Sequence, residues 1–147
     1  MRALIIAIGN RLRADDGVAH HVADLIEPKP GVTLRRLHQL MPEIAAEMQG
    51  VDTVIFLDAD PTAEGPSLEK IAGPAEPAGP LSHSMTPATL VTLASRLYGF
   101  HGEAWMCRLY ARDFSPASEI SPEAAAQVRK GAQLVQELLE AGCMSPR

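Results

Sequence analysis

Continuous apolar runs alternate along this chain with segments of helical periodicity. Residues 3–8 (ALIIAI) are apolar throughout and end at Gly9 and Asn10, a pattern typical of a strand that is covered on both faces. From Asp16 onward, apolar residues recur at helical spacing until Pro28, so this stretch predicts a helix. The chain therefore opens with a strand, a glycine-containing turn and a helix.

The rest of the chain repeats this alternation. Strands are expected at 32–38, within 52–60 and at 103–111, with a short edge strand in the proline-rich stretch 61–80. Helices are expected at 42–50, 85–99 and 121–142, the last with Ser121 as its N-cap and Pro122 in its first turn. This order predicts an α/β fold: a three-layer α/β/α sandwich around a twisted, mostly parallel sheet of about five strands.

Length and composition indicate a single domain over residues 1–142, with 143–147 as a flexible tail. The 147 residues include 46% hydrophobic and 21% charged residues, and the net charge is −5. An acidic chain with scattered positive charges has no basic footprint for nucleic acid, so we expect no nucleic-acid partner. The apolar run 3–8 is far shorter than a membrane span. We therefore expect a cytoplasmic protein without a membrane partner.

The candidate chemistry lies where the predicted strands end. Asp15 and Asp16 follow the first strand, Asp58 and Asp60 end the VIFL strand, and His83 lies in the LSHSMTP segment before a predicted helix. The carboxyl ends of parallel strands meet at one edge of a sheet, and ligands bind there. Asp16, Asp58 and His83 together form a plausible metal set for a borderline or hard divalent ion.

Each of these residues also has a purely structural interpretation. Asp15 or Asp16 suits a helix N-terminus, Asp58 and Asp60 suit the start of a turn, and a loop histidine such as His83 is often only a polar surface residue. On the residues alone these alternatives stay open.

Other kinds of site have weaker signals. Gly9 and Asn10 could begin a phosphate-binding loop, but the GxGxxG spacing is missing. No GxSxG motif is present, and Cys107 falls within a predicted strand, which is a poor position for a nucleophile. Cys107 and Cys143 do not suggest a disulfide framework or a thiolate metal site.

Three segments, in this order and at these separations, resemble the nickel–iron hydrogenase maturation endopeptidases: IAIGNRLRADDGVAHHVADLI, VIFLDAD and SHSMTPATL. The resemblance covers nearly the whole chain. It implies a protease that removes a C-terminal extension from the hydrogenase large-subunit precursor once nickel has been inserted. The family's metal-contacting and catalytic residues match Asp16, Asp58 and His83, and the first acid matches Asp16 rather than Asp15.

This resemblance gives the two adjacent aspartates different roles. Asp15 is expected to cap or steer the first helix, while Asp16 points into the crevice. Gly9 and Gly17 would let the backbone pass close by without a side chain in the way.

The chain departs from the family pattern in two places. Ala19 stands where many relatives have a second glycine, which we interpret as a change in packing. The segment 37–45 (LHQLMPEIA) replaces a glycine-rich loop. Because that loop is expected to touch the substrate, its replacement concerns which hydrogenase is recognised.

Two carboxylates and a histidine lack the thiolates that hold nickel tightly. We therefore expect no tightly bound metal at rest, and nickel supplied by the substrate to a monomeric protease. A nickel-binding chaperone could use the same three residues without cutting, and a nucleotide-dependent enzyme could use Gly9 and Asn10. The expected partner is the hydrogenase large-subunit precursor.

Overall fold

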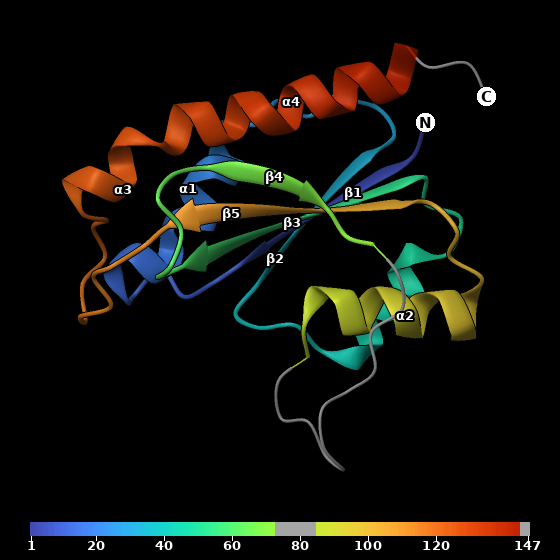
Figure 1. Ribbon diagram of the computed structural model, residues 1–147, viewed down its shortest axis with the longest axis horizontal. Coiled ribbons are helices and arrows are strands. Elements are labelled where there is room, and N and C mark those ends of the chain that lie inside the picture. The colour runs from blue at the N-terminus through green and yellow to red at the C-terminus, as the bar shows by residue number, and fades with distance from the viewer. Residues whose placement is uncertain (73–84, 145–147) are drawn as a thin grey trace.

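The computed structural model, described here for residues 1–72 and 85–144, has a central sheet between two helical layers (Figure 1). The sheet contains five strands in the order β2-β1-β3-β5-β4. The strands are β1 (Ala3–Ile8), β2 (Val32–Leu37), β3 (Thr53–Asp60), β4 (Ser67–Lys70) and β5 (Glu103–Tyr110). All neighbouring pairs are parallel except β4 with β5. The predicted mostly parallel sheet and its edge strand are confirmed.

Helices cover both faces of the sheet, which confirms the predicted α/β/α sandwich (Figure 1). On one face lie α1 (Val18–Asp24), α3 (Pro122–Ala126) and α4 (Val128–Met144). On the other face, α2 (Pro87–Tyr98) packs against the 3-10 helix η2 (Pro42–Met48). Within the described ranges, no helix is both long and apolar enough to cross a membrane.

Two hydrophobic clusters fill the spaces between the layers. On β3, Ile55 and Leu57 belong to the cluster beneath α1 and α4, while Val54 and Phe56 belong to the cluster beneath α2. Successive side chains of a strand point to opposite faces, so a strand buried on both sides becomes a continuous apolar run. The same alternation assigns Asp58 to the face that α2 covers.

Two predicted helices differ from the structure. The segment predicted as a helix at 42–50 is the 3-10 helix η2. The helix predicted at 121–142 is divided into α3 and α4 at Gln127, whose side chain bonds both the backbone N–H and the carbonyl of Tyr110, at 2.7 Å and 2.6 Å. Its start is as predicted, since the Ser121 hydroxyl accepts a hydrogen bond from the Ala124 N–H.

Candidate active site

The strand order reverses direction between β1 and β3. From β1 the chain crosses to β2 on one side and then returns to β3 on the other side of β1. At such a switch point the connections after the two central strands run in opposite directions, and the gap between them is where α/β proteins bind ligands. Asp16 follows β1, and Asp58 lies near the end of β3.

The turn after β1 brings Asp16 back against the end of its own strand. Gly9 has φ +147°, and a Cβ atom on it would lie 1.8 Å from the Asp16 carbonyl oxygen. A Cβ atom on Gly17 would lie 2.9 Å from the Cα of Arg11. The expected close approach of backbone at both glycines is thus confirmed. The Asn10 N–H donates to Asp16 Oδ2 at 2.9 Å, which fixes the carboxylate at this edge.

Asp58 lies in a different environment, because much of its carboxyl group is withdrawn from water. Burial raises the pKa of Asp58 to about 7, and the negative charges of Asp16 and Asp60 add to this effect. The Ala59 N–H and the Arg108 guanidinium act in the opposite direction. The repulsion felt from Asp16 means that the two predicted site carboxylates, 42 positions apart in the sequence, lie close enough to interact.

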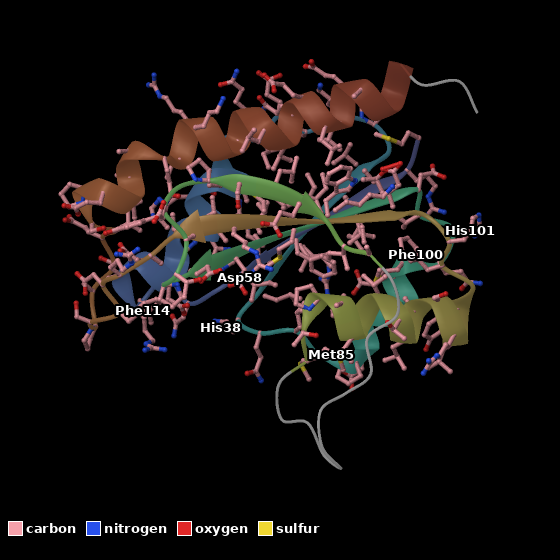
Figure 2. All side chains as sticks on the ribbon, viewed as in Figure 1. His38, Asp58, Met85, Phe100, His101 and Phe114 are labelled. Carbon is pink, nitrogen blue, oxygen red and sulfur yellow. The ribbon has the colours of Figure 1, made fainter. Side chains whose placement is uncertain are left out.

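A cavity of about 410 Å³ opens beside Asp58. Its walls come from the start of α2, including Thr86, and from β5, including Met106 and Arg108. Figure 2 shows Asp58 on the sheet and Met85 at the entry to α2, on the side of the sheet where this cavity lies. The site therefore has open space next to one of its carboxylates.

The carboxylates of Asp16 and Asp58 suit a divalent cation. Oxygen ligands bind hard and borderline metal ions, and a nearby cation would favour the ionised form of Asp58, whose pKa is raised mainly by burial and also by the negative charges of Asp16 and Asp60. Within residues 1–72 and 85–144, no three His, Cys, Asp or Glu side chains are grouped closely enough to hold a metal ion. The third predicted ligand, His83, lies outside the described residues. The three-residue metal set stays a prediction.

Asp15 does not cap the first helix, so the capping part of this prediction is wrong. Neither the 3-10 helix η1 (Ala14–Gly17) nor α1 has a side-chain cap. Asp15 is fully buried, and its carboxylate accepts hydrogen bonds from the backbone N–H groups of Arg112, Asp113 and Ser121, at 3.0, 3.1 and 2.7 Å, and from the Ser121 hydroxyl at 2.9 Å. Asp15 therefore fastens the segment after β5 to the turn after β1.

The hydrogen bonds also decide the ionisation of Asp15. Burial alone would raise its pKa, but the N–H groups of Ser121, Arg112 and Asp113 and the Ser121 hydroxyl together outweigh burial and lower the pKa. A carboxylate that accepts several hydrogen bonds is stabilised in its charged form. Asp15 is a buried structural anion.

The turn interpretation holds for Asp60 but not for Asp58. Asp60 Oδ1 accepts hydrogen bonds from the Thr62 N–H at 2.8 Å and from the Thr62 hydroxyl at 2.7 Å. This is the local side-chain-to-backbone bonding that makes aspartate common in turns. Asp58 lies two residues earlier in β3, and unlike Asp60 it lines the cavity described above.

The phosphate-loop alternative does not fit the turn after β1. The Asn10 N–H, which would have to meet a phosphate, already donates to the Asp16 carboxylate. A phosphate could use this N–H only by displacing the Asp16 carboxylate from it. Sequence reasoning also missed His20, which is 5% exposed with Nε2 at 2.7 Å from the Gly9 carbonyl oxygen. The sequence carries no signal for this contact, since it depends on how the turn folds back onto α1.

Comparison with known proteins assigns the fold. No family model and no curated protein matches the sequence. Among solved structures, the hydrogenase maturating endopeptidase HybD from E. coli superposes with a TM-score of 0.72 at 15% identity, covering 97% of this chain and 94% of its own. This chain has the fold of the hydrogenase maturation endopeptidases.

Two archaeal structures extend this likeness. A hydrogenase 2 maturation peptidase from a Thaumarchaeota archaeon has a TM-score of 0.67 at 23% identity, covering 95% of this chain and 99% of its own. The nickel–iron hydrogenase maturation protease HycI from Thermococcus kodakarensis has a TM-score of 0.69 at 20% identity, covering 95% and 92%. The maturation-endopeptidase fold therefore accounts for nearly the whole chain, including both strands that lead into the candidate site.

Proposed function

We propose that this protein is a hydrogenase maturation endopeptidase that removes the C-terminal extension of a nickel–iron hydrogenase large-subunit precursor after nickel insertion. The observation that carries the proposal is the placement of Asp16 after β1 and of Asp58 near the end of β3, the two strands at the switch point of this fold. Three solved structures with the same fold are named as hydrogenase maturation peptidases. Both acids belong to the sequence segments that resemble that family.

In this proposal, nickel is part of the substrate. The ion held by the precursor's cysteines would contact Asp16 and Asp58, with His83 as the third protein ligand. A metal ion beside a peptide bond polarises the carbonyl group or activates a water molecule. Asp16, fixed by the Asn10 N–H, would offer an oriented oxygen, and the cavity beside Asp58 would hold the polypeptide next to the bond to be cleaved.

The proposal implies that cleavage depends on inserted nickel. Purified protein would be mixed with precursor prepared with nickel and with precursor prepared without it, and the released tail followed by mass spectrometry. We expect the tail only from the nickel-containing precursor, because the site lacks thiolates of its own to retain the metal.

The outcomes separate this function from its alternative. Cleavage of both precursor forms at similar rates would contradict dependence on nickel. If neither form is cleaved while the protein binds nickel and the precursor, the non-catalytic nickel-binding chaperone becomes the better account.

A further inference from the structure

A second cavity, of about 260 Å³, lies on the other side of the turn that holds Asp16. It is formed by the turn after β1, by α1 and by the end of β2. Its lining residues are Gly9, Asn10, Arg11, Leu12, His20, Arg36, Leu37 and His38. The lining contains two arginines and two histidines but no carboxylate, although the whole chain has a net charge of −5. Figure 2 shows His38 and Asp58 on the side of the molecule toward which β2 and β3 run.

Both arginines of this cavity form ion pairs with a carboxylate that does not line it. Asp24, which is not part of the lining, pairs with Arg11 at 3.1 Å and with Arg36 at 2.7 Å. Arg36 also donates to the His20 carbonyl at 3.2 Å. One carboxylate thus restrains two guanidinium groups, which leaves an excess of one positive charge. The Nε and Nη1 groups of Arg11 have no partner elsewhere in residues 1–72 and 85–144.

His20 adds a buried polar atom at the wall of the cavity. Its Nε2 lies 2.7 Å from the Gly9 carbonyl oxygen, so Nε2 carries the proton and donates. Its Nδ1 is then an acceptor, and it is buried without a hydrogen-bond partner among the described residues. An ionised carboxylate has no proton to donate, so Nδ1 can be satisfied only by a donor such as a water molecule that enters together with the carboxylate. The same His20–Gly9 bond joins the cavity wall to the turn that fixes Asp16.

We propose that this cavity binds a carboxylate of the polypeptide that is cleaved at Asp16 and Asp58. The Nε–Nη1 edge of the Arg11 guanidinium, unoccupied within the described residues, matches a carboxylate in shape and charge. Arg36, whose Nη1 and Nη2 are bonded to the His20 carbonyl and to Asp24, adds its positive charge. The carboxylate is either an acidic side chain near the scissile bond or the C-terminal carboxylate of the chain. The identity of the occupant rests on the proposed function, whereas the preference for a carboxylate rests on Arg11 and Arg36.

The carboxylate preference is tested by binding alone. Backbone amide shifts of the protein would be followed by NMR during titration with three short peptides: Ac-Ala-Asp-Ala-NH2, the free acid Ac-Ala-Ala-Ala, and the neutral Ac-Ala-Asn-Ala-NH2. We expect saturable shifts at residues 10–12 and 37–38 with at least one of the two acidic peptides and none with the neutral one. The acidic peptide that binds more tightly distinguishes a side chain from a chain terminus.

The role of Arg11 and Arg36 is tested by substitution, with Arg35, the neighbour of Arg36 on β2, as the matched control. Arg11→Gln combined with Arg36→Gln should weaken binding of the acidic peptide by about tenfold or more. Arg35→Gln removes the neighbouring cation, which pairs with Glu47 at 2.9 Å and does not line the cavity, and it should leave binding unchanged. Equal shifts with the neutral peptide, or equal loss in the Arg35 variant, would overturn the proposal.

Precursor cleavage separates failure of this site from failure of the proposed function. The double variant should raise KM for the precursor by about tenfold or more while kcat stays within about twofold, because a contact made equally in the bound substrate and in the transition state affects binding alone. An unchanged KM would remove the precursor as the occupant. If the protein binds the acidic peptide but cleaves no precursor, the carboxylate site stands and the endopeptidase assignment falls.

Discussion

At the scale of single residues, the adjacent pair Asp15 and Asp16 shows what a sequence can and cannot reveal. The resemblance to known sequences selected Asp16, and the structure brings Asp16 close to Asp58. The role of Asp15 could not be predicted, because the donors to its carboxylate lie 97 to 106 positions away. Residue type alone suggested a local helix cap, whereas the tertiary structure supplied distant N–H groups.

Replacing Asp15 should therefore damage the fold rather than the chemistry. In Asp15→Asn, the amide NH2 would face N–H donors that now meet a carboxylate oxygen, so we expect a loss of roughly 2–4 kcal/mol in the free energy of unfolding at pH 7. Urea denaturation measures it. Asp113→Asn is the matched control on the same segment. Asp113 is exposed, and within the described residues its side chain bonds only Ser115, so this substitution should cost far less stability.

The pH dependence follows from the lowered pKa of Asp15. A carboxyl group whose pKa is lower in the folded state contributes stability above its unfolded pKa and loses it as pH falls through the folded pKa. The gap in stability between the wild type and Asp15→Asn should be full at pH 6–7 and should shrink below about pH 4. A gap that persists at pH 2 would mean that the charge of Asp15 is unimportant.

The contribution of Asp58 to stability should change with pH in the opposite direction. Its pKa is raised to about 7, so the ionised form destabilises the metal-free fold as pH rises from about 4 to 7. At pH 8, in the presence of chelator, Asp58→Asn should stabilise the protein by roughly 2–4 kcal/mol, and the gain should disappear near pH 4. Asp60→Asn is the control, because Thr62 lowers the pKa of Asp60. Equal stabilisation by both variants would contradict this account.

At the scale of secondary structure, buried strands were the most predictable elements. The apolar runs located β1 and β3 to within about a residue, because strands covered on both faces contain few polar positions. The division of the last helix at Gln127 was not predicted. Its cause is a tertiary contact with the backbone of Tyr110, and helical periodicity continues across it. The 3-10 form of η2 likewise has no counterpart in the apolar pattern.

The turn between β1 and η1 should tolerate no side chain at Gly9. Gly9→Ala would place a Cβ atom 1.8 Å from the Asp16 carbonyl oxygen at φ +147°, so we expect a loss of more than about 1 kcal/mol of stability and displacement of Asp16. Thermal denaturation and the amide shift of Asn10 report the two effects. Gly65→Ala is the control, since nothing lies within 4 Å of its Cβ position. A Gly9 variant that matches the Gly65 variant would show that the turn can relax.

At the scale of the whole molecule, the topology creates the site. Asp16 and Asp58 approach each other because β1 and β3 are adjacent at the point where the strand order reverses. The alternation of elements predicted the sandwich and the edge of the sheet at which both acids lie. It could not predict that Asp58 would be withdrawn from water or that a cationic cavity would form beside the same turn. Those features depend on packing between segments that are remote in sequence.

The most direct test of the central claim is the mass of the large-subunit precursor after incubation with this protein and with its two acid variants. We predict that the wild type yields a single shortened subunit and a released C-terminal tail, and that Asp16→Asn and Asp58→Asn slow this release by about 100-fold or more. Both variants should stay folded, and Asp113→Asn should cleave like the wild type. Tail release at the wild-type rate by either acid variant would contradict the account.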